Sequence, residues 1–230
     1  MTIKLLTIAL LGFAGACTSA PSLAGDVDHP AVAELYQSQG CSSCPPADAV
    51  LNALADRRDV LALSFAVTYW DQLGWKDTFA SPAFTQRQWD YARAAGRGSV
   101  ATPQMIVNGR GAINGGNRAE VDAAIRRFAR PAGEPAIAGD AQSVTIATGK
   151  GHAVIWLVRY DPRTIPVPIR AGENGGRTIA HRNIVRQLIR LGAWTGAAAS
   201  YRLPASPPGL VSAVIAQQAV GGPIIAARRI

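Results

Sequence analysis

The chain has 230 residues, of which 48% are hydrophobic and 17% charged, and a formal net charge of +8. This length suits one domain of ordinary size followed by a smaller one. The positive charge comes mainly from arginines that are scattered along the chain. Together with the export signal described next, this argues against nucleic acid as a partner.

The first residues have the pattern of a secretory signal. Lys4 precedes the apolar run Leu5–Ala16, and Ser22–Ala24 fits the small-x-small cleavage pattern. The run is shorter than the ~20 residues that cross a bilayer, and no other stretch predicts a transmembrane helix. We therefore expect residues 1–24 to be a cleaved signal peptide and the protein to be exported to a bacterial periplasm or secreted, without a transmembrane anchor. The alternative is a lipoprotein anchored at Cys17.

The first elements of the mature chain surround two cysteines. The apolar run Ala31–Tyr36 predicts a strand, and a polar turn leads to Cys41-Ser-Ser-Cys44. Pro45-Pro46 favours a helix start, where a missing N–H is tolerated. Apolar residues at helical spacing continue this helix to about residue 55. Strand, turn, Cys-x-x-Cys and helix together are typical of thiol–disulfide chemistry.

A second strand and an aromatic loop follow. Val60–Val67 is a nearly continuous apolar run, which predicts a strand covered on both faces and a β–α–β unit. The loop after it contains Trp70, Asp71 and Trp75, near the strand end where open α/β sheets bind ligands. These three residues are candidates for substrate contact, although such aromatic loops also pack over sheet ends. Thr85–Ala95 predicts a helix.

The next section predicts a strand, a hairpin and a helix. Thr102-Pro103 precedes the strand Met105–Val107, and Arg110–Ile113 continues into a hairpin. Asn117 is a candidate N-cap for a helix that ends near Phe128.

The last part of the chain changes to strand-like periodicity. We expect a linker at 131–140, rich in turn residues, between an α/β domain at 25–130 and a β-rich domain or extension at 141–230. The predicted strands are Ser143–Thr148, His152–Tyr160, Thr164–Ile169, Ile184–Leu191, Val211–Gln218 and Ile224–Ala227. Arg177–Leu191 has a helical alternative.

The cysteine pair has three possible roles. A cysteine at a helix start lies against unpaired N–H groups, which favours the thiolate, so Cys41 is the candidate nucleophile. Cys44, which we expect to be more buried, would then resolve the mixed disulfide. A structural disulfide accounts for the same residues, although so short a loop gains little entropically. A copper-binding chaperone is a third alternative, but no histidine is near the pair in sequence.

Several blocks of the sequence resemble a family of secreted bacterial thioredoxin-like proteins of uncharacterised function. The blocks are Glu34–Asp48, Tyr69–Asp77, Arg87-Gln88, Thr102–Gly109 and Gly172–Arg177. The resemblance implies a thioredoxin-like domain followed by a β-rich, sandwich-like extension. It also implies a cis bond at Thr102-Pro103, in a loop that faces the cysteines and pairs with a substrate backbone.

Two departures from related patterns affect the expected chemistry. A histidine and an aspartate usually stand in this family where the chain has Ala66 and Thr68. Gly115-Gly116 resembles the glutathione-binding turn of glutaredoxins, but Asn117-Arg118 follows where an acidic residue commonly holds the glutathione amine. We therefore expect no bound cofactor or metal, with glutathione disfavoured.

The leading hypothesis is an exported thiol–disulfide oxidoreductase whose partners are protein thiols or disulfides, or a small thiol. Cys41 and Cys44 would be catalytic, and Thr102, Pro103, Trp70, Trp75 and Asp71 would contact substrate. The rival hypothesis is a non-catalytic thioredoxin-like binding module with a structural disulfide.

Overall fold

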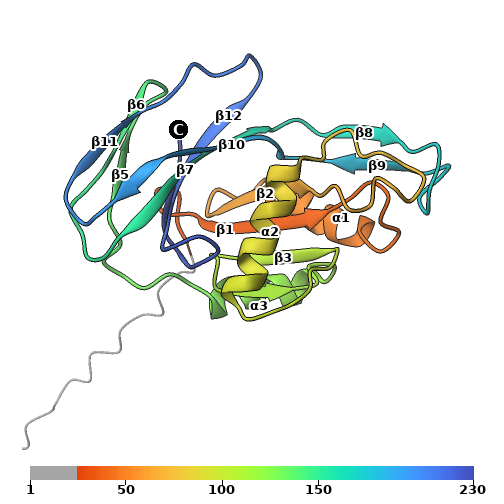
Figure 1. Ribbon diagram of the computed structural model, residues 1–230, viewed down its shortest axis with the longest axis horizontal. Coiled ribbons are helices and arrows are strands. Elements are labelled where there is room, and N and C mark those ends of the chain that lie inside the picture. Colours follow the sequence, from red (N-terminus) through yellow and green to blue (C-terminus); the bar gives the residue numbers. More distant parts are fainter. Residues whose placement is uncertain (1–24) are drawn as a thin grey trace, which may run out of the picture.

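A computed structural model describes residues 25–230 (Figure 1). The predicted signal peptide and Cys17 lie outside the described residues. Within 25–230 the chain forms three helices, which are α1 (Pro45–Leu54), α2 (Pro82–Ala94) and α3 (Arg118–Arg127). Each of the three helices predicted from periodicity is thus present, within a few residues of the expected bounds.

The central feature is an eight-stranded mixed sheet with the order β13-β12-β7-β10-β2-β1-β3-β4. Its first half comprises β1 (Ala31–Gln37), β2 (Val60–Ala66), β3 (Gln104–Val107) and β4 (Gly111–Ile113). β1 pairs in parallel with β2 and antiparallel with β3. Its second half comprises β7 (Ala153–Asp161), β10 (Ile184–Trp194), β12 (Val211–Gln217) and β13 (Ile224–Arg229).

Two small antiparallel sheets complete the fold of the described residues. One has the order β11-β6-β5 and comprises β5 (Ile137–Gly139), β6 (Ser143–Ile146) and β11 (Ala199–Arg202). The other pairs β8 (Ile165–Pro168) with β9 (Thr178–His181), and it extends as an arm beside α1 (Figure 1). The predicted thioredoxin-like α/β part followed by a β-rich extension is confirmed.

Strand alternation divides the core between the two faces of the sheet. All seven residues of β1 are buried. Val32 and Tyr36 pack on the α2 side with Phe84, whereas Ala33 and Leu35 pack on the other side against α1 and α3. A third apolar cluster, which includes Trp194, lies between the β11-β6-β5 sheet and the β7–β12 part of the main sheet. The extension is therefore sandwich-like.

The second half of the main sheet curls back toward the first. The N–H of Ile224 in β13 donates to the carbonyl of Asn108 just after β3, at 2.9 Å. A hydrogen bond thus joins the start of β13 to the turn between β3 and β4, although these strands are at opposite ends of the sheet order. Because strands from both sides of residue 130 share one sheet, the two parts are joined through their backbones. The division at 131–140 into separate domains stays a prediction.

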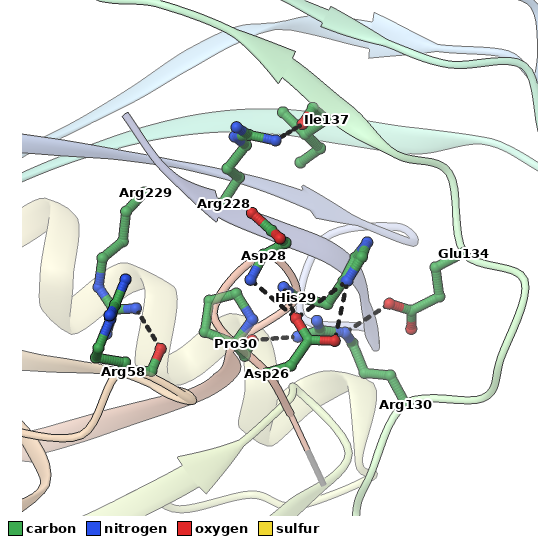
Figure 2. A network of polar contacts seen from close by, with 10 residues as sticks. All are labelled: Asp26, Asp28, His29, Pro30, Arg58, Arg130, Glu134, Ile137, Arg228 and Arg229. Carbon is green, nitrogen blue, oxygen red and sulfur yellow. Dashed lines mark hydrogen bonds and ion pairs between the residues drawn. The ribbon is translucent and has the colours of Figure 1, made fainter. Parts of the chain in front are cut away.

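Polar contacts fix the segment that links the two parts (Figure 2). Arg130 donates to the carbonyl of Pro30 and to the carboxylate of Glu134, both at 2.7 Å. Arg228 donates to the carbonyl of Ile137 at 2.9 Å, at the start of β5. The predicted linker is therefore connected through Arg130 to the residue before β1 and through Ile137 to β13, and it contains the strand β5, which the sequence patterns did not identify.

The extension differs in detail from the sequence prediction. β5 and β11 were not predicted, because each is a short run beside turn residues that carries little periodicity, and β9 lies in the stretch that had a helical alternative. The ambiguous stretch Arg177–Leu191 contains β9 and most of β10, with Asn183 between them at a φ of 49°. The strand interpretation of this stretch is confirmed.

Candidate functional site

The cysteine pair lies between the end of β1 and the start of α1. Cys41 and Cys44 form a disulfide with a Cα–Cα distance of 5.4 Å. The turn before it is closed by Cys41 N–H, which donates to Ser38 O at 3.1 Å, and by Gly40 N–H, which donates to Ser38 Oγ at 3.1 Å. A buried strand and a helix thus fix both ends of the motif.

The start of α1 offers fewer free N–H groups than the motif predicts. Cys44 is the N-cap, and prolines occupy the first two helical positions. Neither proline has an N–H, and the next two N–H groups, of Ala47 and Asp48, both donate to Cys44 O. The helix dipole therefore reaches the cysteines with little direct hydrogen bonding. Ser43 Oγ, 3.4 Å from Cys41 Sγ, is one hydroxyl that contacts the sulfur.

Both cysteines are fully buried, with 0% of either residue exposed. The expectation that Cys44 would be more buried than Cys41 is wrong. Ser42 and Ser43 between them are exposed, so the motif lies at the protein surface with its two cysteine side chains turned inward. The sequence could not show this, because the residues that cover Cys41 come from far along the chain.

The aromatic loop contacts the turn that precedes the cysteines. Trp75 Nε1 donates to Gln39 Oε1 at 2.9 Å, and Asp77 Oδ2 accepts from Gln39 N–H at 2.8 Å. Asp71 Oδ1 accepts from Asp77 N–H at 3.1 Å. Trp75 is thus beside the motif, whereas the observed hydrogen bond of Asp71 stabilises the loop itself.

Thr102 and Pro103 lie at the same end of the sheet as the cysteines. Their peptide bond is cis, and β3 begins at the next residue with Gln104 opposite Tyr36 of β1. Trp70 Nε1 donates to Thr102 Oγ1 at 2.7 Å. The structure therefore brings Trp70, Thr102 and Pro103 together near the segment that leads into the motif.

The two positions where the chain departs from the family pattern have ordinary roles. Ala66 ends β2 and is buried opposite Gln37 of β1. Thr68 N–H donates to Thr85 Oγ1 at 2.9 Å, and the two hydroxyl oxygens are 3.0 Å apart. These contacts fix the start of α2 to the end of β2 and bring no titratable group to the cysteines.

The turn between β8 and β9 makes contacts with the motif that sequence reasoning missed. Asn174 is fully buried, and its Nδ2 donates to Gln39 O at 2.9 Å and to Cys41 O at 2.8 Å. Glu173 Oε2 accepts from Ser42 N–H at 3.2 Å and from Ser42 Oγ at 2.7 Å. The Gly172–Arg177 block was visible in the sequence, but nothing there indicates a contact some 130 residues away.

A buried histidine lies behind the motif. His181 Nδ1 is 3.4 Å from Asp48 Oδ1, and the ring packs edge-on against Phe79. Neither ring nitrogen has a hydrogen bond of good geometry among residues 25–230, so at 3.4 Å the contact with Asp48 is a close approach of two ionisable groups. Burial by itself lowers the pKa of His181, but the contact with Asp48 and the charges of Asp48 and Asp77 raise it above its ordinary value. Burial raises the pKa of both aspartates.

Two further features bear on ligands and membranes. In the part of the chain that the structure describes, no group of three or more His, Cys, Asp or Glu side chains is arranged to hold a metal ion. No helix among these residues is long and apolar enough to span a membrane.

Comparisons with known proteins give one family and two solved structures that are similar to this chain. Residues 32–217 match the family described as "Protein of unknown function (DUF1223)". Protein AGR_C_4864 from Agrobacterium tumefaciens has a crystal structure with a TM-score of 0.75 and 32% identity, over 87% of this chain and 93% of that one. HBP35 of Porphyromonas gingivalis gives a TM-score of 0.59 at 12% identity, over 90% of this chain and 76% of that one, which shows a shared fold. No curated protein matches the chain.

Proposed function

The chain belongs to the DUF1223 family of proteins of unknown function, and we propose that it is an exported thiol–disulfide oxidoreductase. One observation carries the proposal. Cys41 and Cys44 form a disulfide where a buried parallel strand meets a helix, and the cis Thr102–Pro103 bond precedes the strand paired with β1. Thiol–disulfide exchange needs a nucleophilic thiol, a second thiol within disulfide reach and a surface that aligns the partner. The Cys41–Cys44 pair supports the first two requirements, and the cis-proline loop beside β1 supports the third.

The proposed reaction exchanges one disulfide for another. In the reduced protein, the Cys41 thiolate attacks one sulfur of a partner disulfide, whose S–S bond breaks and whose second sulfur leaves as a thiolate and takes a proton. The Cys44 thiolate then attacks Cys41 Sγ, which releases the first partner sulfur as a second thiolate. The partner gains two electrons and two protons, and Cys41–Cys44 becomes the disulfide. The reverse sequence oxidises a partner dithiol.

The buried disulfide limits how a partner reaches it. With both cysteines at 0% exposure, a thiol in solution has no direct path to either sulfur. Asn174 and Glu173, at the tip of the β8–β9 hairpin, bind the residues beside Cys41. Exchange therefore requires this tip to move away from the motif. Thr102, Pro103, Trp70 and Trp75 would then border the exposed sulfur and contact the partner.

The same burial favours a second candidate function, a thioredoxin-like binding module in which Cys41–Cys44 is structural. A bridge that closes so short a loop contributes little through chain entropy, so its value would be to fix the turn before α1. The two functions differ in whether Cys41 forms covalent intermediates.

Trapping separates the two functions. A Cys44→Ala variant, expressed as the full chain in the native compartment, retains the attacking thiol but cannot resolve a mixed disulfide. We expect it to accumulate disulfide-linked complexes that a reductant releases, whereas Cys41→Ser, the matched control, should accumulate none. Cys41→Ser should also abolish reduction of insulin disulfides. Equal trapping by both variants, or no trapped partner with no insulin reduction by the wild type, would overturn the oxidoreductase function.

A further inference from the structure

The tip of the β8–β9 hairpin has a defined conformation. Gly175 N–H donates to Gly172 O at 3.0 Å, Gly176 N–H donates to Ile169 O at 2.8 Å, and Arg177 N–H donates to Asn174 O at 3.1 Å. Gly172 has a φ of 72°, a value that favours glycine. The tip is therefore a compact turn that presents Glu173 and Asn174 in fixed positions.

Arg177 orients the amide of Asn174. Arg177 donates to Asn174 Oδ1 at 2.8 Å, which assigns the oxygen to that side and turns the two N–H groups toward Gln39 O and Cys41 O. This chain of contacts binds the carbonyl of Cys41 to the tip. Glu173, the preceding residue, consequently lies against Ser42, the residue that follows Cys41.

Glu173 puts a negative charge beside the motif. Its carboxylate accepts from both the N–H and the hydroxyl of Ser42, which lowers the pKa of Glu173 and keeps it ionised at neutral pH. Glu173 therefore places a negative charge against the residue directly after Cys41, near the site where the thiol would ionise.

We propose that Glu173 is a positioning and tuning residue that keeps the thiol of reduced Cys41 protonated, so that the pair favours the disulfide state more than the motif alone would. The inference deepens the proposed oxidoreductase function and rests on it for its biological purpose. A nearby carboxylate disfavours the thiolate, which raises the pKa of the thiol. An interaction that stabilises the thiolate also stabilises the reduced state of the pair. A charge that destabilises the thiolate therefore shifts the equilibrium toward the disulfide.

The other charged groups around the motif act at longer range or through neutral contacts. Asp77 reaches the turn through Gln39 N–H, Asp71 contacts Asp77, and Arg177 faces Asn174. Asp48 of α1 and His181 of β9 face one another. Glu173 differs from all of these because its carboxylate binds the residue directly after the proposed nucleophile. Its replacement by glutamine keeps the shape and most hydrogen-bonding capacity while it removes the charge.

The test measures the acidity of Cys41 directly. In a Cys44→Ser background, the ultraviolet absorbance of the Cys41 thiolate is followed against pH with Glu173→Gln and without it, because this readout needs no reagent to reach the buried sulfur. We expect Glu173→Gln to lower the apparent thiol pKa by about half a unit, which is about threefold more thiolate at neutral pH. Since Glu173 is exposed, the difference should shrink as salt is added. Glu120→Gln, which removes an exposed carboxylate at the start of α3, is the matched control and should leave the pKa unchanged.

A second measurement uses the intact pair. Equilibration with glutathione redox buffers should show a larger reduced fraction for Glu173→Gln than for the wild type or Glu120→Gln, by up to about threefold in the equilibrium constant. Identical thiol pKa values and identical equilibria for Glu173→Gln and Glu120→Gln would overturn the inference. Neither measurement needs a natural partner. A failure to trap partners would therefore count against the oxidoreductase function alone, whereas an unchanged thiol pKa would count against the role of Glu173 alone.

Discussion

Two buried ionic groups of residues connect the two halves of the chain, and they differ in how fully their hydrogen bonds are satisfied. The first lies between β1 and α2. Arg87 Nε donates to Glu34 Oε1 at 2.8 Å, Tyr91 donates to the other oxygen of Glu34, and Arg87 also donates to Gln217 Oε1 of β12 at 3.1 Å. The guanidinium packs over the rings of Trp156 and Tyr91. Every charged atom of this group has a partner.

The second group lies between α1 and β9, and it is incomplete. His181 faces Asp48 without a hydrogen bond from either ring nitrogen, and Asp48 Oδ2 has none among the described residues. A buried charge with unmet hydrogen bonds costs stability, so this group gains less from being ionised than the first. The difference indicates that the Glu34–Arg87 group holds the fold together, while the group behind the cysteines changes its charge more readily.

Removal of Arg87 is the strongest test of this comparison. Arg87→Met leaves Glu34 buried with an unpaired charge, so we expect a loss of about 3–5 kcal/mol in the free energy of unfolding. Urea unfolding followed by circular dichroism measures it. Arg93→Met is the control, because Arg93 forms an exposed ion pair with Asp90 at 3.3 Å and should cost less than about 1 kcal/mol. Similar losses for the two variants would contradict the structural role of the first group.

Asn174 tests whether a buried polar group stabilises the fold because its hydrogen bonds are satisfied or because of where it lies in the molecule. It lies at the cysteine end of the molecule, yet both of its donor contacts and its acceptor are paired. Asn174→Ala leaves the carbonyls of Gln39 and Cys41 and the Arg177 guanidinium without these bonds, and we expect it to lower the free energy of unfolding by about 1–3 kcal/mol.

The control for Asn174 is Asn114→Ala, since Asn114 is exposed and accepts from Gly116 N–H at 3.1 Å in a surface turn. Both variants are compared by urea unfolding with the disulfide intact. An Asn174→Ala protein as stable as Asn114→Ala would show that the β8–β9 tip binds the motif only weakly.

The sequence predicted the elements that carry the cysteines, because their signals are local. A six-residue, largely apolar run, a Pro-Pro helix start and an apolar helical period all lie close to Cys41 in the sequence. The residues of the β8–β9 tip that contact the motif could not be predicted from such local signals. The contacts of Asn174 and Glu173 with the motif depend on how β7 and β10 extend the sheet, which brings the β8–β9 arm back over α1. Periodicity does not encode such pairing, so it could not predict that Cys41 is buried.

His181 shows the same limit of prediction from local sequence. His181 stands 137 positions after Cys44 in the chain, and its sequence neighbourhood resembles any short strand. Because β9 packs against α1, the fold places it opposite Asp48. A charged pair at this place has a consequence that sequence proximity could not indicate, namely that protonation behind the motif is coupled to folding.

The smallest expected effect is the pH dependence that His181 introduces. Its pKa is raised in the fold, so the protonated form is favoured there, and the associated stability is complete below about pH 6.5 and is lost as the pH rises through the higher folded-state pKa. The raised pKa of Asp48 acts in the same direction, but from about pH 4 upward. We therefore expect the free energy of unfolding to fall between pH 6 and pH 8.

Substitution separates this effect from the other titrating groups. His181→Gln removes the proton-binding site, so urea unfolding of this variant should show a flatter pH profile between pH 6 and pH 8 than the wild type. His152→Gln, at an exposed position, should keep the wild-type slope. If His181→Gln kept the wild-type slope, the His181–Asp48 group would not cause the pH dependence of stability. The two buried groups would then differ only in how much each contributes to the free energy of unfolding.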